Sequence, residues 1–147
     1  MRTIPPITAL LLSIFNCNAT AQETAEQMRT PAPEGAETYI QSPADGAEVA
    51  SPFTVRFGLR GIGVAPAGVE LPNTGHHHLL IDVDDMPSFD RPLPATEQVV
   101  HFGLGQTQTE LTLPPGEHTL RLLLGDWLHR PHEPPVTSER ITITVTE

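Results

Sequence analysis

The chain has 147 residues, a formal charge of −10 at pH 7 and 38% hydrophobic residues. Its 8 basic residues, all arginine, face 18 carboxylates, which argues against sequence-independent binding to nucleic acid or to an anionic membrane surface. A single cysteine excludes a disulfide scaffold, and 16 prolines with 11 glycines leave little room for helices. The composition therefore favours one small β-rich domain, preceded by a polar segment.

The first 21 residues have the pattern of a secretory signal peptide. Arg2 precedes the apolar run Ile7–Phe15, and a polar stretch then ends in an A-x-A cleavage site at Ala19–Ala21. The apolar run is well short of the roughly 20 residues that cross a bilayer. We therefore expect cleavage after Ala21, a periplasmic or secreted location, and no membrane insertion of the cleaved chain.

Residues 22–37 are acidic, proline-bearing and almost without large apolar side chains, which predicts a flexible arm. Residues 38–147 are predicted to form one all-β domain. Apolar and polar residues alternate there, as at Phe53, Val55 and Phe57, and turn residues separate the alternating segments. This pattern is typical of an immunoglobulin-like or fibronectin-like antiparallel β-sandwich. About seven strands are expected, at residues 38–41, 52–59, 77–84, 98–102, 109–113, 118–124 and 138–146.

Six of the seven histidines are expected to converge on one end of this sandwich. In such a topology, alternate connections between strands gather at the same end. Three of the histidines lie where the strand 77–84 begins, one precedes the connection after 98–102, and two lie in the loop before the last strand. His118 is expected at the far end and is interpreted as structural. The converging residues are His76, His77, His78, His101, His129 and His132.

These histidines suggest a transition-metal site. Neutral imidazole is the commonest side-chain metal ligand, and His76 and His78 would point to the same face of a strand. The cleaved chain has no cysteine, so copper or zinc held by nitrogen ligands is the expected cofactor. The predicted ligands are His76, His78, His101, His129 and His132. The predicted supporting residues are His77, Asp126 and Glu133. The carboxylates of Asp126 and Glu133 would accept hydrogen bonds from ligand imidazoles.

A second interpretation fits the sequence equally well. The histidines would then hydrogen-bond the loop backbone at the end of the sandwich and hold no metal. His77 in particular alternates with Leu79 and Ile81, which is typical of a residue facing the core. Asp82 and Asp84 lack the spacing of a calcium-binding loop, so they are interpreted as solvated.

Three long segments carry a family resemblance: GVAPAGVELPNTGHHHLLID, HFGLGQTQTELTLPPGEHTLRLLLGD and HRPHEPPVTSERITITV. They closely resemble the bacterial family called domain of unknown function 4399, over about residues 39–145. The resemblance implies an exported β domain and implies no activity. Trp127 and Leu128 depart from the usual, more polar pattern. The positions that the resemblance carries over are His76, His77, His78, His101, His118, His129, His132, Asp82, Gly125 and Asp126.

Three functions follow as hypotheses. The first is an exported, non-enzymatic carrier or buffer of copper or zinc, with the histidine cluster as its site. The second is a module that binds another cell-envelope protein, in which the histidines only shape the loops. The third is a metal-dependent enzyme, which would need three protein ligands and an open coordination position. No strong acid–base pair in the sequence supports this third hypothesis.

Overall fold

The structure, a computed structural model, describes residues 29–147. The predicted signal peptide and residues 22–28 of the predicted arm lie outside the described residues. The described part of the chain is all-β and contains no helix, so none of it forms a helix able to span a bilayer. Its strands are β1 (Glu37–Ser42), β2 (Glu48–Ala50), β3 (Phe53–Arg60), β4 (Gly63–Val64), β5 (Thr74–Ile81), β6 (Val99–His101), β7 (Gln108–Leu111), β8 (Gly116–Gly125) and β9 (Ile141–Thr146).

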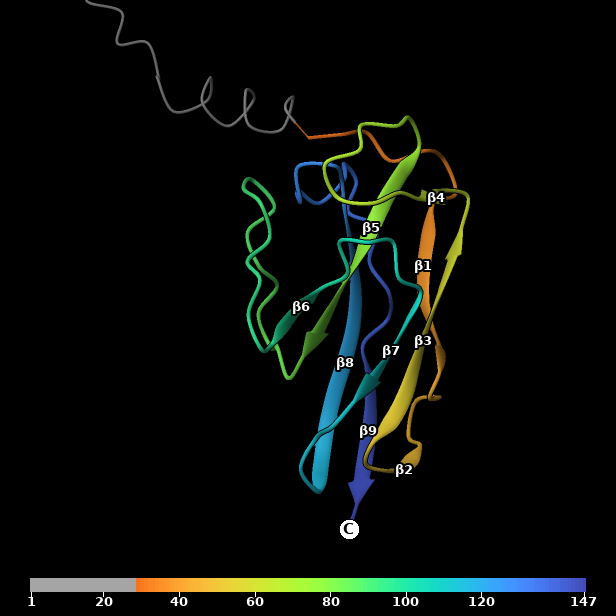
Figure 1. The fold of residues 1–147 in the computed structure, drawn as a ribbon, viewed down its shortest axis with the longest axis vertical. Helices are drawn as coiled ribbons and strands as arrows, with labels where there is room; N and C mark the ends of the chain where they lie inside the picture. The colour runs from red at the N-terminus through yellow and green to blue at the C-terminus, as the bar shows by residue number, and fades with distance from the viewer. Residues whose placement is uncertain (1–28) are drawn as a thin grey trace, which may run out of the picture.

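The strands form two sheets, which confirms the predicted all-β architecture (Figure 1). The smaller sheet has the order β1-β3-β7, and both pairings are antiparallel. The larger sheet has six strands in the order β2-β9-β8-β5-β4, with β6 also paired to β5. Each of the seven expected segments overlaps a strand, although β5 begins and ends three residues earlier than the expected 77–84, and the short strands β2 and β4 are additional. Both of these pair in parallel, β2 with β9 and β4 with β5.

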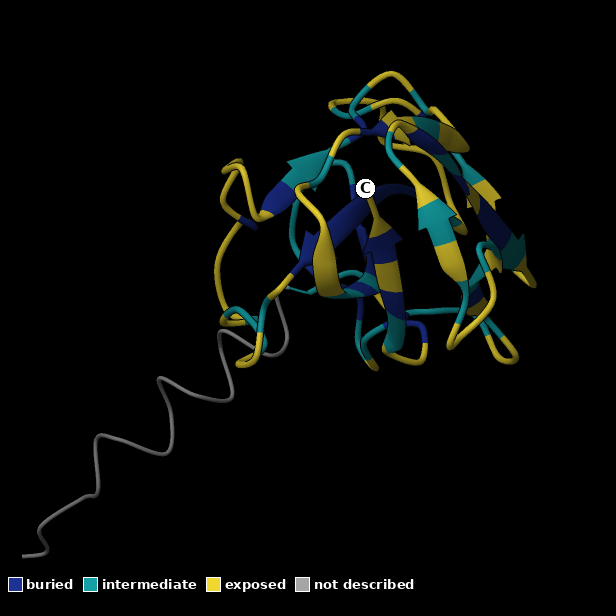
Figure 2. Cartoon of the chain, turned by 90° about the horizontal axis from the view of Figure 1, so that it is seen from below, coloured by how far each residue is buried: buried dark blue, intermediate teal, exposed yellow. Residues whose placement is uncertain are grey.

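The main hydrophobic core lies between the two sheets. Alternation along β3 buries Phe53, Val55 and Phe57, and Leu79 of β5 and Leu122 of β8 pack into the same cluster. Seen from below, the strands curve around this interior (Figure 2). Because each fully buried Leu, Val or Phe side chain contributes about 1.5–3 kcal/mol, this period-two pattern stabilises the packing of the two sheets.

A second, smaller core covers the outer face of the larger sheet. Leu80 of β5, Val99 of β6 and Leu123 of β8 pack there with Leu93, which lies in the connection between β5 and β6. That connection, residues 82–98, folds along one side of the molecule beside β6 (Figure 1). Both faces of β5 are therefore buried, and neighbouring residues along the strand enter different cores.

The pairing of β6 was not indicated by the sequence. The strand pairs antiparallel with β5 and places His101 opposite His78. It thereby brings a histidine onto the larger sheet itself, whereas the sequence pattern places the histidines at the loop end of the sandwich. The site consequently lies on the outer face of the sheet.

Residues 29–36, which belong to the predicted arm, contact the loop between β8 and β9. Arg29 forms an ion pair with Glu133 and donates to the carbonyl oxygen of Pro131 at 3.0 Å. The backbone of Pro31 forms a parallel bridge with Glu133, and its neighbour Ala32 donates to the Glu133 carbonyl oxygen at 2.8 Å. This part of the chain therefore packs against the loop that follows β8.

Candidate metal centre

Strand register brings three histidines together. His76 and His78 are two residues apart on β5, so they share the face that also carries Leu80. His101 of β6 lies directly opposite His78 across the antiparallel pair. Directly opposed side chains in such a pair have Cβ atoms about 4.5–5.5 Å apart, so the two rings meet without any loop rearrangement.

The three rings form a compact cluster. Ring centroids lie 4.9 Å apart for His76 and His78, 5.0 Å for His76 and His101, and 5.1 Å for His78 and His101. One nitrogen from each ring lies within 4.8 Å of one nitrogen from each of the others. The three rings converge closely enough to form a candidate metal site, in which one ion about 2.0–2.1 Å from each nitrogen would hold the nitrogens about 3.3 Å apart in tetrahedral geometry.

His129 approaches the same cluster from the loop after β8. Its ring centroid lies 5.0 Å from that of His76, 4.7 Å from that of His101 and 6.3 Å from that of His78. The residue has a φ of 64°, in the left-handed region that non-glycine residues seldom adopt. This conformation occurs at functional sites and also at ordinary turns, as at Asn73 in this chain. His129 therefore stands as a fourth imidazole beside the three on the sheet.

Two glycines leave room for these rings. Gly125 of β8 lies opposite His76, and a Cβ at this position would be 2.8 Å from Cε1 of His78 and 3.4 Å from the backbone of His129. A Cβ on Gly103 would overlap the ring of His101. The sequence suggested only a turn around Gly103, because this packing depends on the pairing of β6 with β5.

The imidazoles on β5 are neutral at physiological pH. Burial lowers the pKa of His76 to about 4 and that of His78 to about 3, with the neighbouring histidines acting in the same direction. Burial and the nearby His129 ring also lower the pKa of His101. The carboxylate of Asp126 opposes part of this effect at His76, so a negative charge lies near the cluster. Neutral imidazoles keep the lone pairs that a metal ion requires.

The buried ring nitrogens lack hydrogen-bond partners. Within residues 29–147, neither ring nitrogen of His76 or His78 has a partner, and Nε2 of His101 has none either. Leaving a buried polar atom unpaired costs about 1–3 kcal/mol, so such groups are rare and call for a physical explanation. A coordinated cation would satisfy one nitrogen on each ring.

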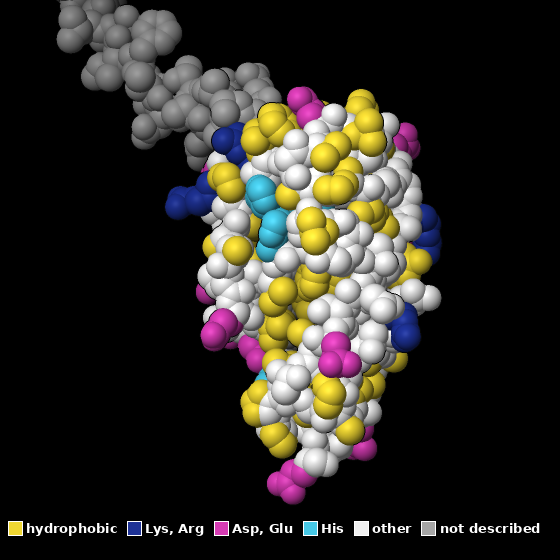
Figure 3. Space-filling view, viewed as in Figure 1, with side chains coloured by type: hydrophobic (Ala, Val, Ile, Leu, Met, Phe, Trp, Pro, Cys, Tyr) yellow, Lys and Arg dark blue, Asp and Glu magenta, His cyan; other side chains and the backbone are white. Residues whose placement is uncertain are grey.

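The cluster also reaches the surface. His76 and His78 are fully buried, whereas His101 and His129 are partly exposed. Histidine side chains are visible together on one face of the molecule, flanked by hydrophobic side chains (Figure 3). Two of the four rings at this centre are therefore in contact with solvent.

A protein-family model for a domain of unknown function (DUF4399) matches residues 55–146, which is more than half of the chain. The chain belongs to the DUF4399 family. This match confirms the resemblance noted in the sequence, and it includes every histidine of the cluster. Comparisons with curated proteins and with solved structures gave no match.

In this DUF4399 domain, His132 and His77 lie apart from the cluster. His132 packs against Gly75, and its Nε2 lies 3.2 Å from the carbonyl oxygen of Thr74. A side chain at Gly75 would point to the same face of β5 as His77, so His132 lies on the side of the strand opposite His76. His77 itself packs on Phe57 in the main core, with ring centroids 5.1 Å apart. Alternation along β5 therefore separates both residues from the cluster.

The two predicted supporting carboxylates have other partners. Asp126 accepts hydrogen bonds from the loop backbone and from Thr30, and Glu133 pairs with Arg29. The sequence gave no signal for the contacts of Arg29 and Thr30, which lie in the segment predicted to be a flexible arm.

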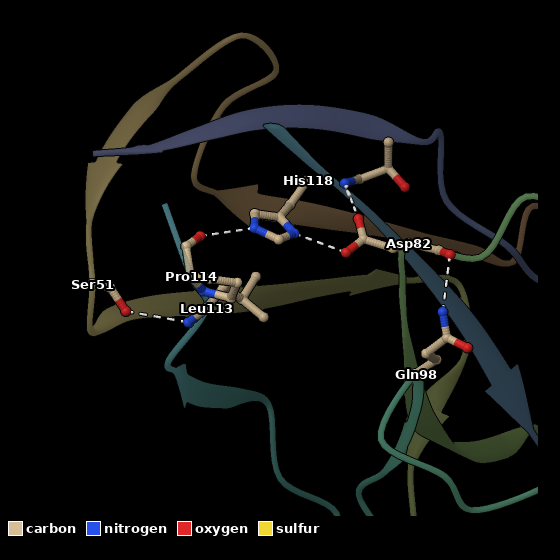
Figure 4. Close-up of polar contacts among 7 residues, drawn as sticks. Ser51, Asp82, Gln98, Leu113, Pro114 and His118 are labelled. Carbon is tan, nitrogen blue, oxygen red and sulfur yellow. Dashed lines mark hydrogen bonds and ion pairs between the residues drawn. The ribbon is translucent and has the colours of Figure 1, made fainter. Parts of the chain in front are cut away.

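His118 lies near the start of β8, at the end of the sheet away from the cluster, as the sequence indicated. Each of its ring nitrogens has a partner (Figure 4). Its Nδ1 is 2.7 Å from Oδ2 of Asp82, and its Nε2 is 2.9 Å from the carbonyl oxygen of Pro114. The hydrogen bond to Asp82 is the main cause that raises the pKa of His118. Both partners are acceptors, so only the protonated ring can donate to both, and this arrangement is that of a structural histidine.

Proposed function

We propose that this DUF4399 domain binds one transition-metal ion, copper or zinc, through His76, His78 and His101, with His129 as a fourth ligand. The observation that carries the proposal is the presence of three imidazoles from two paired strands, with nitrogens within 4.8 Å of one another. Their depressed pKa values and unpaired nitrogens support it further. His132 is left out of this ligand set because it lies on the other side of β5.

The donor set supports copper or zinc over harder ions. Imidazole nitrogen suits zinc, copper and nickel, whereas magnesium and calcium select oxygen ligands. Among divalent first-row ions, copper(II) binds most tightly to a given site, and zinc accepts the tetrahedral geometry that four rings can supply.

A carrier or buffer role fits this centre better than catalysis. Catalytic zinc sites keep one coordination position open for water or substrate, and we propose that the ring of His129, which lies beside those of His76 and His101, takes that position here. The partial exposure of His101 and His129 provides a route for metal exchange. The proposal further includes export after removal of residues 1–21, so the protein would handle metal in the periplasm or outside the cell.

We also infer that the fold is an immunoglobulin-like sandwich. Strands β1, β3 and β7 follow the order of first, second and fifth strands in one sheet, while β9, β8 and β5 are adjacent in the other. This order, together with the length of about 100 residues, is typical of that architecture.

The test is metal-dependent stabilisation of residues 22–147. A ligand at a hundred times its dissociation constant stabilises the native state by about 2.7 kcal/mol, which corresponds to a rise in melting temperature on the order of 10 °C. We expect this rise with Cu²⁺ or Zn²⁺ and none with Mg²⁺. The double variant His76→Ala/His78→Ala should lose it, and the control His118→Gln should keep it. An equal rise in the double variant would refute the ligand assignment.

A further inference from the structure

Asp126 lies at the base of the turn that carries His129. Its side-chain Oδ1 accepts hydrogen bonds from the backbone N–H groups of Leu128 and Arg130, both at 2.9 Å. Its Oδ2 accepts the hydroxyl of Thr30 at 2.6 Å. The backbone closes the same turn, because Asp126 N donates to the Arg130 carbonyl oxygen and His129 N donates to that of Asp126. One buried carboxylate thus organises residues 126–130.

These contacts hold His129 in its unusual conformation. The N–H groups on both sides of His129 donate to a single carboxylate oxygen, which fixes the turn around the residue with φ of 64°. The left-handed conformation is unfavourable for an L-residue, so the turn needs such an anchor to keep it. Hydrogen bonds to a charged acceptor are stronger than those to a neutral one, so the two bonds to Asp126 offset that cost.

We propose that Asp126 is a positioning residue of the metal centre, which holds the turn 126–130 so that His129 completes the coordination begun by His76, His78 and His101. Asp126 does this without touching the ion, because its oxygens are occupied by Thr30 and the turn backbone. This inference rests on the proposed function and adds to it the origin of the fourth ligand.

The carboxylate also supplies charge. It is 1% exposed and lies near His76, so its negative charge is poorly screened by water. An imidazole that binds a metal ion is neutral and provides no charge to balance a divalent cation, and a buried carboxylate nearby favours the cation electrostatically. Asp126 therefore has two separable effects on metal binding, one through geometry and one through charge.

Two substitutions separate these effects. Asp126→Ala removes the acceptor for Leu128 and Arg130 together with the charge. Asp126→Asn keeps a carbonyl oxygen for both N–H groups, removes the charge, and replaces Oδ2, the acceptor for Thr30, with an amide NH2 group. Thr30→Val serves as a matched control, because it deletes the contact to Oδ2 and leaves the bonds within the turn.

The experiment titrates the mature chain with Cu²⁺ and records the nitrogen hyperfine pattern by electron paramagnetic resonance. Dissociation constants come from competition with a chelator, and the metal-free melting temperature of each variant checks folding. We expect four coordinated nitrogens in the wild type, in Thr30→Val and in Asp126→Asn, and three in His129→Ala and Asp126→Ala. Loss of the positioning residue should weaken binding about 10- to 100-fold, as is usual for groups that orient metal ligands.

A double-mutant cycle tests whether Asp126 acts through His129. In the His129→Ala background, adding Asp126→Ala should weaken binding only by the charge effect that Asp126→Asn shows alone. Four nitrogens and an unchanged dissociation constant in Asp126→Ala would overturn the inference. It would also be overturned if the loss of affinity in the double variant equalled the product of the losses in Asp126→Ala and His129→Ala. Should Asp126→Ala fail to fold, a three-nitrogen pattern in Asp126→Asn would overturn it. Failure of the wild type to bind Cu²⁺ or Zn²⁺ would instead contradict the proposed function itself.

Discussion

The two ends of the larger sheet hold histidines in opposite environments. At one end, His76 and His78 are fully buried, and their ring nitrogens have no hydrogen-bond partners among the described residues. At the other end, both nitrogens of His118 meet oxygen acceptors, one of them the carboxylate of Asp82 (Figure 4). The same side chain is therefore kept neutral in one place and favoured as a cation in the other.

This contrast identifies a candidate ligand only where several such rings converge, because His77 is also buried with a pKa lowered to about 4 and yet packs in the main core. Burial without a partner lowers the pKa and leaves lone pairs available, at a cost in folding free energy. A carboxylate partner raises the pKa, and its hydrogen bond to the ring connects the end of β5 to the start of β8. Perturbed groups of the first kind are the ones that point to a functional site.

The largest expected effect comes from filling the space beside the buried rings. Gly125→Ala would place a Cβ 2.8 Å from the ring of His78, so the rings would have to move apart. We expect Cu²⁺ or Zn²⁺ affinity to fall roughly 100-fold, measured by chelator competition. Gly63→Ala is the matched control, because its Cβ would meet Thr74 at an ordinary 3.4 Å. Unchanged affinity in Gly125→Ala would show that the rings are not confined as described.

The next effect is a loss of stability in acid. His76 and His78 take up protons near pH 6.5 when unfolded but only near pH 4 and pH 3 when folded. As the pH falls below 6.5, the unfolded state binds more protons, and each histidine lowers the free energy of unfolding by up to about 1.4 kcal/mol per pH unit. Above pH 6.5 this contribution is constant. Urea unfolding of chelator-treated protein at pH 7, 6 and 5 measures the slope.

The matching variant is His76→Leu/His78→Leu, which removes both titrating groups and keeps apolar bulk beside Leu80. Its free energy of unfolding should depend less steeply on pH between 7 and 5 than that of the wild type. Equal slopes would show that these two histidines are protonated in the folded protein at mildly acidic pH.

The smallest effect is expected for His118 at the other end of the sheet, where the contribution to the free energy of unfolding decreases as the pH rises. The pKa of His118 is raised on folding, so its contribution to stability is fully present below pH 6.5 and disappears as the pH rises through that raised value. His118→Gln should lower the free energy of unfolding by about 1 kcal/mol at pH 6, because Asp82 is partly exposed, and by less at pH 9. A deficit that grows with pH would contradict the assignment of a charged His118.

Alternation along the chain predicted much of the fold. The pattern of Phe53, Val55 and Phe57 identified β3, and the same rule placed His76 and His78 on one face and His77 on the other. These predictions succeed because a strand has a period of two that does not depend on its neighbours. The expected position of His118 at the far end followed from the order of the strands alone.

The composition of the ligand cluster required the tertiary structure. Long-range pairing places β6 beside β5, and the register of this pair sets His101 opposite His78. The loop after β8 brings His129 against the rings of the cluster, whereas it places His132 against the opposite face of β5. The sequence by itself determined that imidazoles would gather at one end of a β domain without thiol ligands. Only the folded structure decided which of them meet, because register and loop packing depend on contacts between residues far apart in the chain.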